Sequence, residues 1–148
     1  MDHGTIEKKM LEELTLNEIN ILKDDPVRPH LDYVKRINGN KKVFLLRDGE
    51  KIHAVICSAF TSEVPKSEED LDNEGNSVCT FYTVWSYSKG AGRDIVNTVF
   101  SHIKNQFPNV KRVVTLSPKT EMARNFHLSN GAVELSENSE SINYEYLL

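Results

Sequence analysis

Hydrophobic and polar positions follow a strand-like pattern in the middle of the chain. Residues 41–60 form two β-prone runs joined around Asp48 and Gly49, and an Asp-Gly pair between such runs is a strong hairpin signal. The segment VCTFYTVW at residues 78–85 predicts a third strand. Further β-prone runs are KRVVTL at 111–116, AVEL at 132–135 and INYEYLL at 142–148.

Helical spacing of apolar residues precedes this pattern. Residues 5–23 place apolar side chains opposite charged ones, which predicts an amphipathic helix, with a second helical stretch beginning at Thr15. The prolines of DDPVRP at 24–29 interrupt the helical pattern. Residues 30–38 predict another short helix.

Two further helices are predicted after the third strand. From Arg93 the apolar residues recur at i, i+4 and i+8, which indicates a helix that FPNV at 107–110 ends. Residues 117–131 predict a second helix, with Ser117 or Thr120 as its cap.

Composition narrows the class of protein. The chain has 148 residues, of which 39% are apolar and 27% charged, so we expect one globular domain spanning residues 1–148. A net charge of −4 argues against nucleic acid as a partner, and no apolar run is long enough to span a membrane. The charged start of the chain lacks the apolar core of a signal peptide, so we expect a cytoplasmic protein. We expect this protein to be a monomer or a homodimer.

Cysteine and histidine side chains predict no metal site. Cys57 and Cys79 lie in strand-like runs without ligand spacing, so we expect buried, unreactive thiols. The five histidines, at positions 3, 30, 53, 102 and 127, are too scattered to form a ligand set. We expect His53 at a half-exposed strand position, and Tyr82 and Trp85 in the core or in the wall of a cleft.

The loop SKGAGR, residues 88–93, connects the third strand to the helix that follows it. The N-terminus of a helix offers free N–H groups and the positive end of a dipole, which together favour anions. Gly90 and Gly92 let the backbone approach a ligand closely, and Lys89 and Arg93 add positive charge. The loop has neither the third glycine of a dinucleotide fingerprint nor the GK[ST] of a P-loop.

The order hairpin, third strand, glycine turn, helix, strand, helix, strand resembles the GNAT superfamily of acyltransferases. Gly90 and Gly92 match its turn pattern Q/R-x-x-G-x-G/A, with Tyr87 in the place of Gln or Arg. The resemblance implies an α/β (α+β) fold with a mixed, mostly antiparallel central sheet flanked by helices. It also implies that amides of the turn hold the pyrophosphate of acetyl-CoA. The coenzyme-binding residues would be Val84, Ser88, Lys89, Gly90, Ala91, Gly92 and Arg93.

A narrower resemblance covers residues 78–148. The segments FYTVW…KG, FPNVKRVVTLSP, NFHLSNGA and NYEYL are similar to the catalytic domain of malonyl-CoA decarboxylase, whose chemistry depends on a serine and a histidine. Ser117 and His127 match them. By this resemblance, Ser117 would hold the malonyl carboxylate or polarise the thioester, and His127 would deliver a proton. If residues 118–127 formed one straight helix, the two side chains would lie about 13–15 Å apart.

Other interpretations fit the same residues. An N-acetyltransferase would use His127 as the acid and Glu63 or Glu121 as the base, and the six acidic side chains of residues 62–77 suit a cationic amine acceptor. A module that binds coenzyme A without catalysis is a third possibility. Ser117 could be only a helix cap, and His127 only a histidine satisfied by a carbonyl or water. Residues 62–77 predict a solvated loop with one helical turn, or a flap over a substrate.

Overall fold

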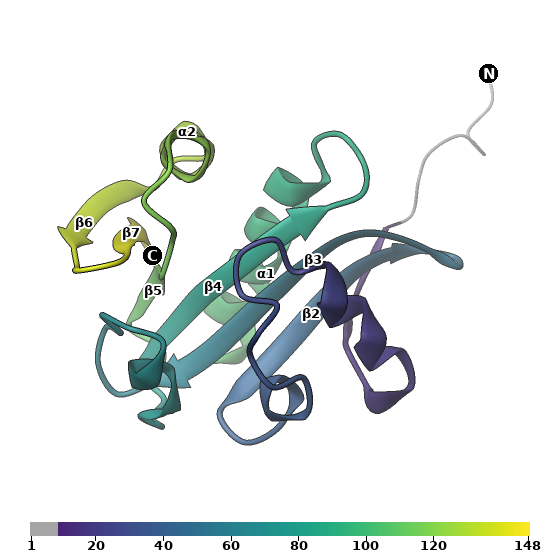
Figure 1. Cartoon of the computed structure of the whole chain (residues 1–148), viewed down its shortest axis with the longest axis horizontal. Helices are drawn as coiled ribbons and strands as arrows, with labels where there is room; N and C mark the ends of the chain where they lie inside the picture. The colour runs from purple at the N-terminus through teal and green to yellow at the C-terminus, as the bar shows by residue number, and fades with distance from the viewer. Residues whose placement is uncertain (1–8) are drawn as a thin grey trace.

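The computed structural model describes residues 9–148, which form a seven-stranded sheet with helical elements on both faces (Figure 1). The strand order is β1-β2-β3-β4-β5-β7-β6, and every pair is antiparallel except β4–β5. The predicted mixed, mostly antiparallel sheet is therefore confirmed. The strands are β1 (Met10–Glu13), β2 (Lys41–Asp48), β3 (Lys51–Thr61), β4 (Val78–Ser86), β5 (Arg112–Thr115), β6 (Val133–Glu137) and β7 (Ile142–Tyr146).

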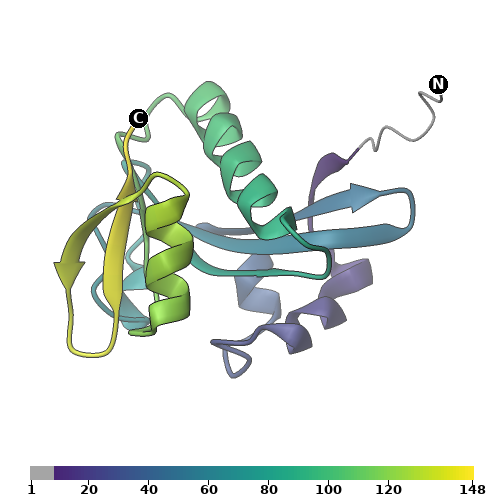
Figure 2. The ribbon, with the colours of Figure 1, turned by 90° about the horizontal axis from the view of Figure 1, so that it is seen from above.

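The two faces of the sheet carry different helical elements (Figure 2). Helix α1 (Ala91–Gln106) lies above the sheet in that view, and the 3-10 helices η2 (Leu16–Asp24) and η3 (Val34–Ile37) lie below it. Each face has its own cluster of buried apolar side chains. Because β2 and β3 are covered on both faces, their sequences are nearly continuous apolar runs.

The hairpin predicted at Asp48 and Gly49 is confirmed. Asp48 pairs with Lys51 at the end of the β2–β3 ladder. Gly49 has a φ of +59°, a left-handed conformation that glycine adopts without steric cost.

Strands β4 and β5 pair at their first residues and then separate. Their ladder ends at Phe81 and Thr115, and one further bond joins the Leu116 N–H to the Phe81 carbonyl at 3.1 Å. From Tyr82 to its end, β4 has no strand on that side within residues 9–148. The sequence helps to end the ladder, because Pro118 has no N–H to donate to β4.

Helix α2 (Glu121–Ser129) begins after Thr120 and not after Ser117, the other cap that the sequence allowed. Thr120 caps it, with its Oγ1 accepting from the Ala123 N–H at 3.1 Å. Ser117 belongs to the sheet instead, where it forms a β-bridge with Ile142. The chain between Ser117 and α2 is therefore not helical.

The predicted helix over residues 5–23 is wrong for its middle part. Residues 10–13 form β1, which pairs with β2 and places Met10 opposite Arg47. Arg47 also pairs with the Glu12 carboxylate at 2.8 Å. Residues 5–8 of that prediction lie outside the described residues. The helical stretch expected from Thr15 is present as η2.

The acidic segment 62–77 contains one helical turn, η4 (Glu69–Asp72), as predicted. It is anchored to the sheet, because the Asn143 side chain donates to the Pro65 carbonyl at 2.8 Å. Across residues 9–148, no helix is long and apolar enough to cross a membrane.

Candidate functional site

The separation of β4 and β5 opens a cavity of about 690 Å³. A cavity of this size suits a drug-sized ligand or the reactive end of a larger one. Its walls come from β4, the start of α1, the chain after β5, α2 and residues 26–27. The lining is mainly apolar, and no Asp, Glu, Lys or Arg side chain belongs to it among the described residues. Its polar members include Thr83, Ser86, Ser117, Thr120 and His127.

The turn before α1 presents backbone N–H groups beside this cavity. Gly90 is the N-cap residue, with a φ of +80°. The N–H groups of Gly90, Gly92 and Arg93 have no acceptor within residues 9–148, whereas the Ala91 N–H donates to the Ser88 carbonyl at 3.1 Å. Because Gly92 also lines the cavity, its N–H lies where the cavity meets the helix N-terminus. Helix N-termini of this kind favour anions.

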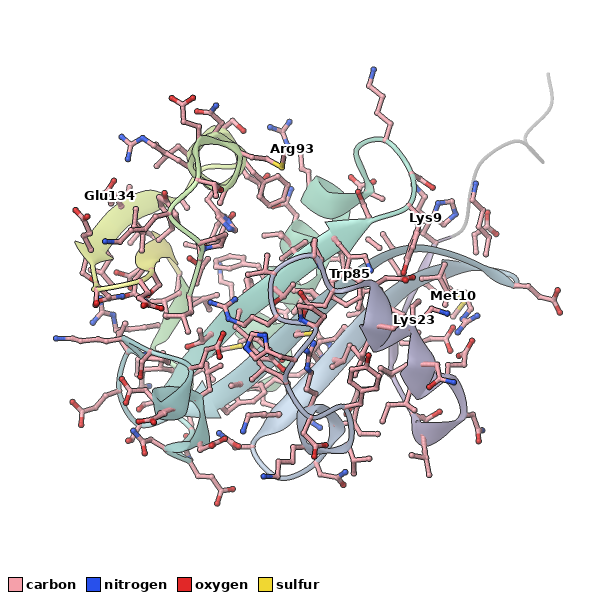
Figure 3. The ribbon with its side chains drawn as sticks, in the orientation of Figure 1. Lys9, Met10, Lys23, Trp85, Arg93 and Glu134 are labelled. Carbon is pink, nitrogen blue, oxygen red and sulfur yellow. The ribbon has the colours of Figure 1, made fainter. Side chains whose placement is uncertain are left out.

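Two cations adjoin the turn. Lys89 and Arg93 are both exposed. Arg93, which lies beside α2 in Figure 3, donates from Nη2 to the Ser129 carbonyl at 3.2 Å. This contact ties the start of α1 to the end of α2 and leaves positive charge at the mouth of the turn.

His53 is buried, so the prediction of a half-exposed position is wrong. The turn after β4 folds back over it, and the Tyr87 N–H donates to the His53 carbonyl at 2.8 Å. His53 Nδ1 shares a hydrogen bond of 2.7 Å with Ser88 Oγ. The Ser88 hydroxyl is therefore oriented from beneath by a buried imidazole.

Val84 lines the cavity from the part of β4 that has separated from β5. Peptide groups along such an unpaired edge can bind the amides of an extended ligand. Trp85 lies at the same edge and is visible in the middle of Figure 3.

Ser117 is held rigidly at the wall of the cavity. Its N–H and C=O exchange hydrogen bonds of 2.9 Å with Ile142. Its hydroxyl donates to Thr115 Oγ1 at 2.8 Å, and Ser117 is only 3% exposed. Because a hydroxyl proton rotates readily, Ser117 can redirect it from Thr115 to a bound ligand.

His127 projects from α2 into the same cavity and is 6% exposed. Burial lowers the pKa of His127 from 6.5 to about 4, so its imidazole is neutral at pH 7. Its Nδ1 hydrogen-bonds the Tyr146 hydroxyl at 2.7 Å, and its ring stacks on Tyr144. Within residues 9–148, the side-chain hydrogen bond of His127 is made through Nδ1 and not through Nε2.

The Tyr146 hydroxyl can fix the tautomer of His127 by donating to it. Its oxygen is also 3.5 Å from Asn130 Nδ2, a group that can only donate. Burial raises the pKa of Tyr146 to about 12, so the hydroxyl keeps its proton and can donate it to His127 Nδ1. Nε2 then carries the imidazole proton and is the donor available to the cavity.

The cavity therefore brings Ser117 and His127 together, although no hydrogen bond joins the two. The single straight helix from residue 118 to 127 does not form, because α2 starts only at Glu121. The chain turns between Ser117 and α2, and both side chains line one cavity.

The carboxylates considered as bases for acetyl transfer lie elsewhere. Glu63 lines a separate polar pocket, together with Lys66 and Asp70. Glu121 begins α2, but its side chain is not part of the cavity wall. Within residues 9–148, no group of three or more His, Cys, Asp or Glu side chains could hold a metal ion.

Sequence reasoning missed Tyr146 and the residues of segment 24–28. Tyr146 lies in the closing NYEYL, but its pairing with His127 depends on β7 running beside β5, which no local pattern indicates. The DDPVRP segment indicated only a break between helices, yet Pro26 and Val27 line the cavity. Asp24 accepts a hydrogen bond of 2.6 Å from the Tyr87 hydroxyl, which in turn accepts from Trp85 Nε1 at 2.9 Å.

Comparison with known proteins gives structural but not sequence matches. No protein-family model and no curated protein matches the sequence. Among solved structures, malonyl-CoA decarboxylase from Agrobacterium vitis superposes with a TM-score of 0.77 at 14% identity, over 95% of this chain and 60% of that one. The chain thus spans about 60% of the length of that decarboxylase.

Acetyltransferases match over nearly their full length. The Campylobacter jejuni N-acetyltransferase PseH, in complex with acetyl coenzyme A, gives a TM-score of 0.64 at 16% identity, over 95% of this chain and 99% of that one. A Bacillus subtilis acetyltransferase in complex with CoA gives 0.68 at 11% identity, over 95% and 99%. These likenesses, together with the sheet that separates between β4 and β5, show that the chain has a GNAT-like fold.

Proposed function

We propose that this protein binds an acyl-CoA thioester and decarboxylates its acyl group, as malonyl-CoA decarboxylase does with malonyl-CoA. One observation supports the proposal above the others. The buried Ser117 hydroxyl and the neutral imidazole of His127 line a single cavity, and that cavity reaches the free N–H of Gly92 at the start of α1.

The coenzyme would lie along the separated edge of β4. The diphosphate would accept hydrogen bonds from the N–H groups of Gly90, Gly92 and Arg93, with Ser88 and Lys89 beside it. The pantetheine amides would pair with the peptide groups around Val84. This places the thioester between β4 and β5, at the level of Ser117 and His127.

The proposed reaction breaks the bond between the acyl methylene and its carboxylate. The electron pair of that bond moves into the thioester and forms an enolate, while CO₂ leaves. The Nε2–H of His127 donates to the enolate and its proton passes to the carbon. A solvent proton then restores Nε2–H, while the Tyr146 hydroxyl keeps its proton and its hydrogen bond to Nδ1. The net reaction consumes one proton and yields acetyl-CoA and CO₂.

The surroundings of the acyl group favour this chemistry. Ser117 can turn its hydroxyl toward the substrate carboxylate and fix its orientation. The mostly apolar wall, which includes Phe126 and Val27, withdraws water from that carboxylate. Burying a charge is costly, whereas the CO₂ that forms carries none, so the wall favours the product side of the bond cleavage.

Acyl transfer to an amine is less well supported by the site. An amine acceptor needs a base and commonly a carboxylate to attract its cation. Glu63 lies in a different pocket, and no acidic side chain lines the cavity among the described residues. The acetyltransferase alternative remains an outcome of the test below.

The test is to incubate the protein with malonyl-CoA, and in a separate reaction with acetyl-CoA, and to follow acetyl-CoA by mass spectrometry, with and without a panel of amines. The test variants are Ser117→Ala and His127→Gln. The control variants are Ser101→Ala and His102→Gln, which change the same residue types on α1, outside the cavity. Binding of acetyl-CoA to every variant is measured by calorimetry.

We expect the protein to convert malonyl-CoA without an amine. Ser117→Ala and His127→Gln should lose this conversion, and both control variants should keep it. Consumption of acetyl-CoA only when an amine is present would instead show an acetyltransferase. Binding without any conversion would show a coenzyme-binding module. Absence of any affinity for acyl-CoA would overturn the assignment of the site altogether.

A further inference from the structure

We propose that Arg28 is a positioning residue that holds β4 and β5 apart and so fixes the place of Ser117 in the cavity. Arg28 comes from the segment between η2 and η3, far in sequence from β4 and β5. It is 4% exposed, and its side chain reaches the point where the two strands separate.

The guanidinium bridges the two separated strands. Its Nη1 donates to the Tyr82 carbonyl of β4, and its Nη2 donates to the Leu116 carbonyl after β5 at 2.9 Å. Nη1 also lies 3.5 Å from Thr83 Oγ1. The planar fork of arginine suits two acceptors held at a fixed separation.

Arg28 occupies the place of the next rung of the β4–β5 ladder. The Leu116 N–H bonds the Phe81 carbonyl, so in a continuing parallel ladder the Leu116 carbonyl would accept from the Thr83 N–H. It accepts from Arg28 instead. The Leu116 carbonyl, which the separation would leave unpaired, is thereby satisfied. So is the carbonyl of Tyr82, which has no partner residue in the β3–β4 register, and the bound guanidinium keeps the two strands apart.

The rest of the segment keeps Arg28 in this position. Its Nε donates to Glu68 Oε2 at 2.9 Å, and Glu68 belongs to the acidic segment 62–77. The Arg28 N–H donates to Asp25 Oδ1 at 2.7 Å, and the Arg28 carbonyl accepts from Arg36. Arg28 is therefore held from its backbone and from the outer side of its guanidinium.

The effect on the site is direct although Arg28 does not line the cavity. Leu116 immediately precedes Ser117, and Tyr82 is part of the cavity wall. A shift of the Leu116 carbonyl moves the Ser117 hydroxyl relative to His127. Misplacement by about 1 Å is enough to reduce a rate by roughly 100-fold.

The test compares Arg28→Lys, Arg28→Met and the control Glu68→Gln. Lysine keeps the positive charge opposite Glu68 but cannot bridge two carbonyls. Glu68→Gln removes the negative charge but keeps a side-chain oxygen that can accept from Arg28 Nε, so both carbonyl contacts stay in place. Deuterium uptake is measured in peptides covering residues 112–117 and, as a reference, 91–106. Turnover of malonyl-CoA and the affinity for acetyl-CoA are measured on the same samples.

Both Arg28 variants should take up deuterium faster in residues 112–117, with α1 unchanged. Turnover should fall by about 10- to 100-fold, whereas acetyl-CoA affinity changes less than threefold, because the amides of the α1 turn are untouched. Glu68→Gln should resemble the unmodified protein in all three measurements.

Unmodified exchange and turnover in Arg28→Lys would overturn the proposal, because they would show that charge alone suffices. Unfolding of both Arg28 variants while Glu68→Gln folds would also contradict it, since Arg28 would then support the whole fold and not this junction. The turnover measurement depends on the function proposed above. Deuterium uptake needs no substrate, so it tests Arg28 even if malonyl-CoA is not converted.

Discussion

His127 differs from a free histidine because folding removes it from water. Burial lowers its pKa from 6.5 to about 4, so the unfolded chain binds a proton in this range and the folded chain does not. The free energy of unfolding should therefore fall by about 3 kcal/mol as the pH falls from above 6.5 to 4. Urea unfolding at a series of pH values measures this slope.

The control for this prediction is His127→Gln, which cannot take up a proton. Its stability should depend less on pH between 4 and 6.5 than that of the unmodified protein. Equal slopes for the two proteins would show that His127 titrates normally. For turnover, the neutral imidazole predicts no loss of activity as the pH rises from 6 to 8, whereas an imidazolium acid would lose activity over that range.

Tyr146 is predicted to act through His127. In Tyr146→Phe the ring remains, but Nδ1 loses the hydroxyl that fixes its tautomer. Turnover should fall by about 10- to 100-fold with little change in acetyl-CoA affinity. This is less than the roughly 100- to 10,000-fold that direct proton transfer usually contributes, because Tyr146 acts only through His127. Steady-state kinetics and calorimetry on the same protein check this. A change in affinity without a change in turnover would contradict it.

At single residues, the side-chain type and the surrounding segment can nominate a site residue, and the roles of those nominated here stay predictions. The side-chain types of Ser117 and His127 and the sequence segments around them singled out both residues, and both line one cavity in the structure. His53 was misjudged because alternation along a strand gives the face but not what covers it, and here the turn at Ser88 covers it. Arg28 could not be predicted, since its acceptors lie in two distant strands.

At the scale of elements, the two glycines of the α1 turn should respond differently to alanine. Gly90 has a φ of +80°, so Gly90→Ala should cost about 1–2 kcal/mol of stability. A Cβ on Gly92 would lie 3.4 Å from Phe126 Cε1, an ordinary contact, so Gly92→Ala should be tolerated. Its methyl group would stand at the cavity wall, and acetyl-CoA affinity should fall about tenfold.

Thermal unfolding and calorimetric titration separate the two effects. Gly90→Ala should show the larger fall in melting temperature, and Gly92→Ala the larger fall in affinity. The reverse pattern would mean that the coenzyme does not approach the start of α1. Lys89→Ala provides a third comparison, because it removes an exposed charge without touching the backbone.

Elements were predictable where the sequence pattern and the tertiary contacts agree. The Asp48–Gly49 hairpin and α1 follow from turn chemistry and a regular apolar stripe. β1 was predicted as a helix because its residues have helical apolar spacing, yet the free edge of β2 binds its backbone. Pairing with an existing edge is a non-local gain that outweighs weak helical preference in four residues.

At the scale of the whole molecule, the site depends on both faces of the sheet. The α1 turn belongs to one face, and segment 24–28 comes from the elements on the other. The two meet where β4 and β5 separate, and the Tyr87 hydroxyl links them through Asp24. We therefore expect the N-terminal elements and the sheet to unfold as one unit, as a single domain would.

Asp25 provides the sharpest test of that unity. Its side chain is fully buried, accepts from the Val27 and Arg28 N–H groups, and pairs with Arg36 Nη1 at 2.7 Å. Arg36 is itself only 1% exposed, so Asp25→Asn leaves a buried cation without its counter-charge and should cost about 3–5 kcal/mol. If the chain is one cooperative unit, this loss lowers the stability of the whole sheet.

Fluorescence of Trp85, the single tryptophan, and far-UV circular dichroism should then shift together along the urea axis. Transitions that separate in the variant would show that the N-terminal elements unfold alone, and the cavity would lose one wall while the sheet remains intact.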